Sequence, residues 1–82
     1  MRVRLRFLCA DLPIPPGIHE IDMDDGGTVE QALTAYRQIN PAGDPNDTLR
    51  ESMFLIGRQS AQLDTVLQDM DTLMVMRILG GG

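Results

Sequence analysis

The chain opens with a strict alternation of apolar and charged side chains. Over residues 1–8, the odd positions are apolar and the even positions carry three arginines before Leu8. A period of two indicates a strand with one buried face. Residues 11–17 contain three prolines and a glycine, so they require an irregular connection. Residues 18–23 resume the period of two, but Ile18 falls on the opposite face from the apolar positions that follow it, which indicates a bulge.

The next segment carries the pattern of an amphipathic helix. Thr28 and Gln31 have the spacing of a capping box, in which each side chain binds the other residue's backbone amide. Apolar residues then follow at intervals of three and four. This spacing predicts a helix that ends at about Gln38 or Ile39 and covers one side of a sheet. The Pro, Gly, Asn and Asp residues over 40–47 predict a loop.

The segment after this loop predicts a β-hairpin. A short apolar strand over 53–56 and a return strand over 59–63 flank a tight turn that contains Gly57. Residues 64–67 fit a single helical turn capped by Asp64.

The last predicted strand is strongly apolar. Residues 72–79 are apolar on both faces apart from Thr72 and Arg77, as expected of a central strand or of one whose outer face meets another protein. With a single helix, the predicted fold class is α+β. The helix packs across a mixed sheet in which the first and last strands lie side by side.

Composition narrows the class of protein. A chain of 82 residues, 43% hydrophobic and 23% charged, fits one small folded domain. Its apolar runs are far too short for a membrane span or a signal peptide, and its single cysteine cannot form an internal disulfide, so we expect a cytoplasmic protein with no membrane partner. The net charge of −5 and the scarcity of aromatic residues argue against nucleic acid as a partner.

The residue types that could carry catalysis do not form a recognisable site. Cys9 is interpreted as a small buried hydrophobe, and His19 as a surface or strand-edge residue, because no general base or ligand is tied to either by the sequence. The acidic residues lack the spacing of a calcium-binding loop, and no glycine-rich phosphate loop is present. We therefore expect a protein that is not an enzyme, with no metal site and no bound cofactor.

Three glycines, Gly80, Gly81 and Gly82, follow the last predicted strand. Three extended residues reach about 10 Å, and without Cβ atoms they fit a narrow channel in another protein. A terminal carboxylate becomes an electrophile once ATP adenylates it, and a sulfur nucleophile or an amine can then attack it. The plainer alternative is a frayed end with no role. We expect one domain over 1–79 and a flexible glycine tail over 80–82.

The outer side of the last strand is a candidate partner surface. If the odd-numbered residues of this strand face the helix, then Met74, Met76 and Ile78 face outward. Methionine adapts well to binding partners, although these residues could also complete a core or be ordinary exposed residues. The neighbouring row of Arg2, Arg4 and Arg6 is either a solvated face or suited to an acidic docking surface.

Residues 53–60 and 63–73, together with the final Gly81-Gly82, resemble the C-terminal half of the MoaD/ThiS family of ubiquitin-like sulfur carriers. Met70 stands where the family turn usually has glycine. The resemblance implies a ubiquitin-like β-grasp fold, with a mixed sheet of four to five strands packed on one main helix. It also implies that a ubiquitin-activating-like adenylyltransferase uses ATP to adenylate Gly82, which is then converted to a thiocarboxylate. Further implied roles are threading of the partner's channel by Gly80 and Gly81, and a partner interface of Met74, Met76, Arg77, Ile78 and Leu79.

Three classes of function remain open at this point. The first is a sulfur carrier for cofactor biosynthesis, for molybdopterin or for the thiazole of thiamin, whose second partner is a sulfur-accepting synthase large subunit. The second is a ubiquitin-like modifier joined through Gly82 to lysines of other proteins; the chain itself has no lysine and cannot form lysine-linked chains. The third is a non-covalent β-grasp subunit of an enzyme complex, for which the tail is incidental.

Overall fold

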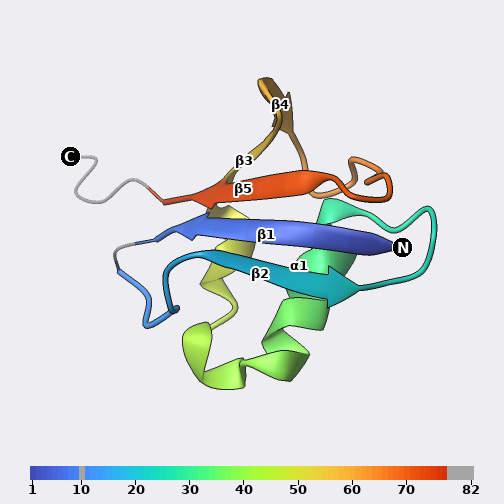
Figure 1. The fold of residues 1–82 in the computed structure, drawn as a ribbon. Helices are drawn as coiled ribbons and strands as arrows, with labels where there is room; N and C mark the ends of the chain where they lie inside the picture. The colour runs from blue at the N-terminus through green and yellow to red at the C-terminus, as the bar shows by residue number, and fades with distance from the viewer. Residues whose placement is uncertain (10, 78–82) are drawn as a thin grey trace.

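A computed structural model describes residues 1–9 and 11–77 of the chain. It contains five strands and one α-helix (Figure 1). The strands are β1 (Arg2–Leu8), β2 (Ile18–Asp22), β3 (Met53–Ile56), β4 (Gln59–Ala61) and β5 (Thr72–Met76), and the helix is α1 (Val29–Ile39). Two short 3-10 turns, η1 (Pro41–Gly43) and η2 (Thr48–Glu51), lie between α1 and β3. The predicted α+β class is confirmed.

The strands form one mixed sheet in the order β2-β1-β5-β3-β4. The first and last strands, β1 and β5, are parallel neighbours, as predicted, and the remaining pairs are antiparallel. Strand β5 therefore lies in the middle of the sheet, hydrogen-bonded on both sides. The parallel arrangement brings the last described residue, Arg77, to the same edge as the end of β1 (Figure 1).

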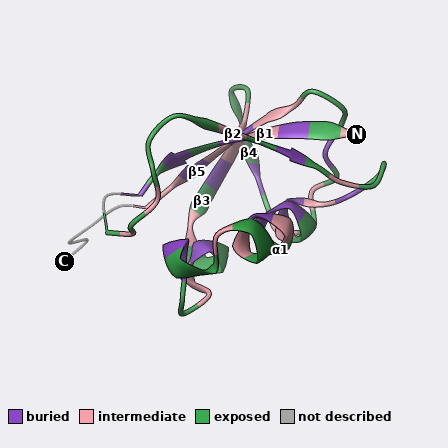
Figure 2. Cartoon of the chain, turned by 60° about the horizontal axis from the view of Figure 1, so that its bottom comes forward, coloured by how far each residue is buried: buried purple, intermediate pink, exposed green. Residues whose placement is uncertain are grey.

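The core lies between the sheet and α1. In β1 the apolar residues Val3, Leu5 and Phe7 are buried, as their alternation predicted. The helix buries its apolar stripe against them, and Figure 2 shows the buried segments running along the strands and along the side of α1 that faces the sheet. Helix α1 begins with the predicted capping box: Gln31 N donates to Thr28 Oγ1 at 3.3 Å and Thr28 N donates to Gln31 Oε1 at 2.9 Å.

Two local predictions were wrong. No bulge interrupts β2, because its register with β1 runs without a break from Asp22 opposite Arg2 to Ile18 opposite Arg6, so Ile18 lies on the solvent side and is 57% exposed. Residues 64–67 do not form a helical turn. Their backbone instead binds the start of α1, where Leu67 N donates to Gly27 O at 2.8 Å, and this bond accompanies complete burial of the Leu67 side chain.

The segment between α1 and β3 is organised by a buried carboxylate. Asp44 is fully buried, and its two oxygens accept hydrogen bonds from the backbone amides of Thr48 at 2.8 Å and Leu49 at 3.0 Å and from the Thr48 hydroxyl at 2.8 Å. Arg37 of α1 lies 3.8 Å from the same carboxylate. These contacts hold η2 in place, so that Leu49 enters the core.

No α-helix in the described part of the chain is long and apolar enough to cross a bilayer. Over the same residues, no three His, Cys, Asp or Glu side chains lie where they could share a metal ion.

Candidate functional site

The predicted reactive end of the chain continues from the central strand. Strand β5 ends at Met76, and Arg77 is the last residue of this segment that the structure describes. The expected roles of Gly82 in activation and of Gly80 and Gly81 in threading lie outside the described residues. The same holds for the expected interface residues Ile78 and Leu79. The structure describes the surface from which this end departs.

The face of the sheet that α1 does not cover carries an apolar patch. Its members come from four strands: Leu8, Ile18, Met53, Leu55, Met74 and Met76. Leu8 is 48% exposed and Met53 is 52% exposed, whereas Leu55 and the two β5 methionines are half-buried. Within the described residues, no element covers this face (Figures 1 and 2). Exposed apolar side chains that gather in one place mark interaction surfaces more often than scattered ones do.

The two methionines of β5 form the middle of this patch. Met74 lies between Arg6 of β1 and Leu55 of β3, and Met76 lies between Leu8 and Met53. Their chain neighbours Leu73 and Val75 are fully buried on the helix side. The outward orientation predicted for Met74 and Met76 is therefore confirmed, and it follows from the two-residue period of a strand whose inner face is buried.

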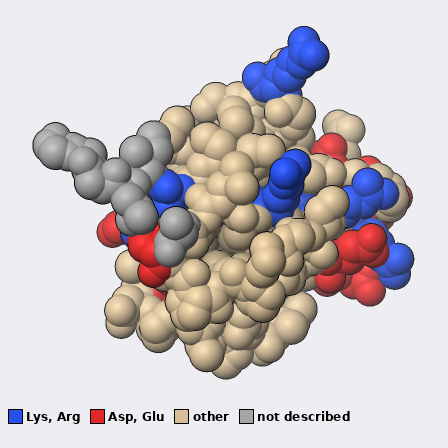
Figure 3. All heavy atoms as spheres, turned by 60° about the vertical axis from the view of Figure 1, so that its left-hand side comes forward, with Lys and Arg blue, Asp and Glu red and all other residues tan. Residues whose placement is uncertain are grey.

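Arginines share the outer face with the apolar patch. Arg2 lies 3.4 Å from a Glu20 oxygen and 3.3 Å from an Asp22 oxygen, both on the neighbouring strand β2. Over residues 1–9 and 11–77, no carboxylate lies within ion-pair distance of Arg4 or Arg6. Figure 3 shows basic side chains standing apart from one another on a largely uncharged surface, with acidic groups gathered near its edges.

Arg77, which the sequence placed in the partner interface, is held by three hydrogen bonds within the domain. Its Nε donates to Asp11 Oδ2 at 2.8 Å, its Nη1 donates to the backbone oxygen of Thr48 at 2.6 Å, and its backbone amide donates to Leu8 O at 3.1 Å. Three separate segments therefore meet at this residue. The guanidinium is engaged within the domain and anchors the end of the described chain to its body.

A shallow hollow of about 230 Å³ lies at the Arg77 end of the patch. Its lining residues are Glu51, Met53, Met76 and Arg77. Two of the four are methionines of the apolar patch and the other two are charged, so the hollow combines apolar and charged lining. Such a recess suits an anchoring side chain of a partner protein.

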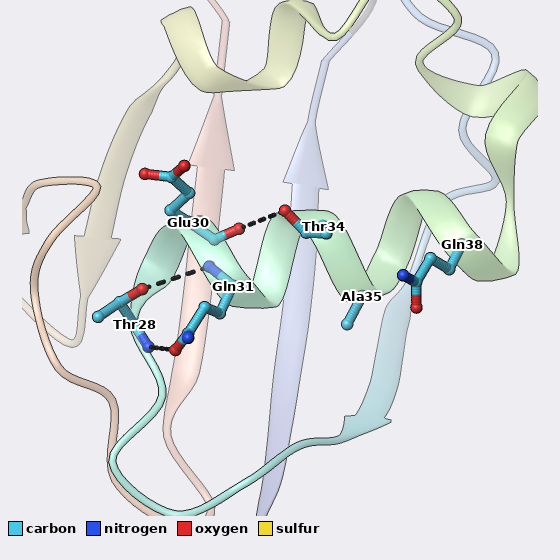
Figure 4. Close-up of a pocket in the computed structure, with 6 residues that line it drawn as sticks. All are labelled: Thr28, Glu30, Gln31, Thr34, Ala35 and Gln38. Carbon is cyan, nitrogen blue, oxygen red and sulfur yellow. Dashed lines mark hydrogen bonds between the residues drawn. The ribbon is translucent and has the colours of Figure 1, made fainter.

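A second hollow, of about 410 Å³, lies over α1 and is lined by Thr28, Glu30, Gln31, Thr34, Ala35 and Gln38 (Figure 4). Its polar groups serve the helix itself: Thr28 and Gln31 form the capping box, and the Thr34 hydroxyl donates to Glu30 O at 3.1 Å. The hollow lies on α1, and α1 packs against the sheet face opposite the apolar patch. We therefore assign it no role at the site.

Cys9 is buried and His19 lies on an edge strand, as the sequence indicated for each. Cys9 is 9% exposed, and its thiol donates to Val75 O at 3.6 Å. Burial and the nearby Asp11 charge raise its pKa, so the reactive thiolate is disfavoured. His19 lies on the edge strand β2, where its ring meets Phe7 and Tyr36 edge-on and Nε2 lies 2.8 Å from Pro15 O. Neither side chain forms a catalytic pair with the other.

Four members of the patch were missed by sequence reasoning: Leu8, Ile18, Met53 and Leu55. For Leu8 a signal was available, because it occupies an even position of the β1 alternation and must share the face of the arginines. For the other three, the sheet order was needed. Only the placement of β3 beside β5 brings Met53 and Leu55 next to the methionines.

No family model matches this sequence, and neither does any curated protein sequence. Solved structures do match the fold. Small archaeal modifier protein 1 (SAMP1) from Haloferax volcanii has a TM-score of 0.79 and 23% identity, and the match covers 100% of each chain. A second structure of the same H. volcanii protein has a TM-score of 0.75 and 22% identity, covering 95% of this chain and 98% of that one. Ubiquitin from Caldiarchaeum subterraneum has a TM-score of 0.55 and 10% identity, with 100% of each chain covered. At these identities the likeness establishes the fold, which is the expected ubiquitin-like β-grasp.

Proposed function

We propose that this chain is a ubiquitin-like carrier or modifier protein whose Gly82 carboxylate is activated by an ATP-dependent adenylyltransferase. The observation that carries the proposal is the uncovered apolar patch centred on β5, the strand from which the chain continues to its glycine end. The match to a modifier protein from H. volcanii, which runs the full length of both chains, gives it further support. In this role the chain is a substrate of its partner and needs no catalytic group of its own.

The domain contributes rigidity and position. Strand β5 is hydrogen-bonded on both sides, and Arg77 is tied to Asp11, Thr48 and Leu8, so this last described residue has a defined place relative to the patch. A partner that covers the patch therefore receives the tail at a fixed point. The five residues from Ile78 to Gly82 reach at most about 17 Å when extended, which sets the distance from the docking surface to the reacting atoms.

The chemistry takes place at the Gly82 carboxyl group. A carboxylate oxygen attacks the α-phosphorus of ATP and displaces pyrophosphate, which leaves an acyl adenylate. In the sulfur-carrier branch, hydrosulfide or an equivalent sulfur nucleophile attacks the carbonyl carbon and expels AMP, which leaves a thiocarboxylate. In the modifier branch, a lysine amine of another protein attacks the activated carbonyl carbon, the activating group leaves, and an amide forms. Both branches share the adenylation step.

The two branches have different support. The resemblance of residues 53–73 and of Gly81-Gly82 to MoaD/ThiS proteins favours the sulfur carrier, with a molybdopterin or thiazole synthase as acceptor. The solved neighbour that is named as a modifier favours conjugation to proteins. The absence of lysine means that an activated copy has no lysine acceptor on another copy, which limits conjugation to single additions.

The first test is activation. Full-length protein ending at Gly82 is mixed with the ubiquitin-activating-like adenylyltransferase of the source organism, and ATP–pyrophosphate exchange is measured. We expect exchange with the full chain and none after deletion of Gly81 and Gly82. Equal exchange with the deleted chain, or no exchange with an enzyme that is active on another substrate, would refute the proposal.

The second test separates the branches. With a sulfur donor present, intact-mass analysis in the sulfur-carrier branch shows one oxygen replaced by sulfur at Gly82. In the modifier branch, immunoblots of the source cells show a ladder of conjugates that disappears when Gly82 is deleted.

A third test concerns the docking surface, for which we propose Met74 and Met76 together with Arg77, Ile78 and Leu79. Met74→Asp places a charge at the centre of the patch, where a partner would bury it. Hot-spot residues near the centre of an interface contribute about 2 kcal/mol or more, so if Met74 is one, KM in the exchange assay should rise at least about 30-fold. Val66→Asp is the matched control, because Val66 is 57% exposed but pairs with Thr28 at the start of α1. An unchanged KM for Met74→Asp would refute the assigned surface.

A further inference from the structure

We infer that Arg4 and Arg6 select the partner: they require carboxylates on the surface that covers the apolar patch. The inference rests on the proposed function and adds the chemistry of the partner's docking surface. Of the three arginines in the β1 row, only Arg4 and Arg6 are assigned this role, because Arg2 already pairs with Glu20 and Asp22 of the same chain.

The distribution of ion pairs sets these two arginines apart. The chain has seven arginines and twelve acidic residues, so there are enough carboxylates for every arginine to form an ion pair within the chain. Four arginines have a carboxylate oxygen at 4 Å or less: Arg2, Arg37, Arg50 and Arg77. Within the described residues, Arg4, Arg6 and Arg58 have none, and Arg58 lies in the exposed turn between β3 and β4. Two of these three thus lie on the sheet face that also carries the patch.

Arg6 lies within the patch rather than beside it. The sheet register places it between Ile18 of β2 and Met74 of β5, with Leu8 two residues further along the same face. The aliphatic stem of arginine packs well against such side chains while the guanidinium stays in water. A partner that covers Met74 must therefore also remove water from the Arg6 guanidinium. Burying a charge without a counter-charge costs several kcal/mol, so a well-matched partner supplies an acceptor there.

Arg4 and Arg6 also repel one another. They are two residues apart on one face of β1, which puts their backbones about 7 Å apart. Arg4 lies opposite Thr72 of β5 and opposite Glu20 of β2, but the Glu20 carboxylate is engaged with Arg2. Adjacent like charges on a sheet are unfavourable in the free protein and become favourable when an opposite charge lies between or above them.

A carboxylate-bearing protein surface fits this arrangement better than a phosphate-bearing ligand. Arg6 has the apolar residues Ile18 and Met74 as its cross-strand neighbours, and a protein interface covers such side chains better than a nucleic acid backbone does. The net charge of −5 further opposes any approach by a polyanion. The partner that covers the apolar patch therefore presents an apolar protein surface that carries one or two Asp or Glu residues opposite β1.

The test is binding of the full chain to the ubiquitin-activating-like adenylyltransferase of the source organism, measured by titration calorimetry at low and high salt. Arg4→Gln and Arg6→Gln are made singly and together. We expect Kd to rise about tenfold for each and the salt dependence of Kd to decrease. Arg50→Gln is the control, because it makes the same charge change at a residue paired with Glu30 of α1. Its Kd should stay within about twofold of that of the unsubstituted protein.

Each outcome decides the inference. A rise in Kd for the two β1 variants but not for Arg50→Gln supports it. A charge swap then identifies the contact: the enzyme residue is the one whose Glu→Arg change restores binding to an Arg6→Glu chain. Unchanged Kd for both variants overturns it. Failure of the unsubstituted chain to bind the enzyme, formation of a dimer through this face in sedimentation experiments, or tighter binding to RNA than to the enzyme also overturns it.

ATP–pyrophosphate exchange in the same samples keeps the two proposals distinguishable. Arginine-dependent binding without exchange refutes the activation of Gly82 but leaves the docking chemistry intact. Exchange with an unchanged KM for the arginine variants refutes the docking chemistry alone.

Discussion

Replacement of Asp44 should reveal how much of the stability depends on one buried carboxylate. The residue has no solvent exposure, and its oxygens accept three hydrogen bonds from Thr48 and Leu49, with Arg37 at 3.8 Å. Asp44→Ala removes every acceptor and leaves the buried Leu49 amide without a partner. Asp44→Asn keeps the shape and one acceptor oxygen, but it removes the charge and turns an amide group toward a donor.

The expected loss follows from these contacts. A hydrogen bond to a charged group contributes about 1.5–3 kcal/mol, and leaving a buried group unpaired costs about 1–3 kcal/mol. We therefore expect Asp44→Asn to lower the free energy of unfolding by about 2–3 kcal/mol and Asp44→Ala by about 3–5 kcal/mol. A domain of this size has about 4–12 kcal/mol in total, so the alanine variant should be close to unfolding.

The same carboxylate makes stability depend on pH. Burial on its own raises the pKa of Asp44, but the hydrogen bonds from Leu49 and Thr48 and the charge of Arg37 outweigh it and hold the pKa below its usual value. A group whose pKa is lower in the folded state stabilises the protein above the unfolded pKa, which is about 3.9 for Asp. That contribution is lost as the pH falls below this value toward the folded-state pKa.

The assay is urea denaturation followed by circular dichroism, at neutral pH and across the acid range. Asp44→Asn should show a lower free energy of unfolding at pH 7 and a smaller further loss in acid than the unsubstituted protein. Asp24→Asn, at an exposed turn position, is the control and should change the free energy by less than about 0.5 kcal/mol. A loss below about 0.5 kcal/mol for Asp44→Asn, or an unchanged acid dependence, would refute this reasoning.

Three further predictions concern single residues. Met70 has a left-handed backbone, φ 70°, so Met70→Gly should stabilise the fold by about 0.5–1 kcal/mol in thermal denaturation. If Met70→Ala gave a gain of the same size, relief of backbone strain would not be the cause. Thr28→Ala removes the hydroxyl of the capping box and should cost about 1 kcal/mol in urea denaturation; no change would mean that the cap contributes nothing. Cys9 is 9% exposed and burial raises the pKa of its thiol, so it should react with iodoacetamide far more slowly in the native protein than in urea; equal rates would contradict its burial.

Local patterns predicted most of the fold. The alternation in β1, the capping box of Thr28 and Gln31, and the two-faced apolar last strand each contain their signal within a few residues, and the structure confirms all three. The β-grasp assignment followed from the resemblance, and the solved neighbours confirm it.

The predictions that failed depend on contacts between distant segments. Residues 64–67 do not form a helical turn, and the backbone of Leu67 instead binds Gly27, a bond that no local pattern indicates. Asp44 looked like one more polar loop residue, because its burial depends on where η2 and Arg37 come to lie. In the same way, the sequence placed Arg77 on a strand face but could not show that its guanidinium pairs with Asp11, 66 positions away.

The position of β5 also determines how the molecule responds to mechanical force. A pull on the end of the chain acts along a strand that is bonded to β1 on one side and to β3 on the other, with β1 running in the same direction. The load is then shared by both ladders in shear, and the hydrogen bonds cannot open one after another as they would at an edge strand. A force applied at this end would therefore have to load two hydrogen-bonded neighbours at once.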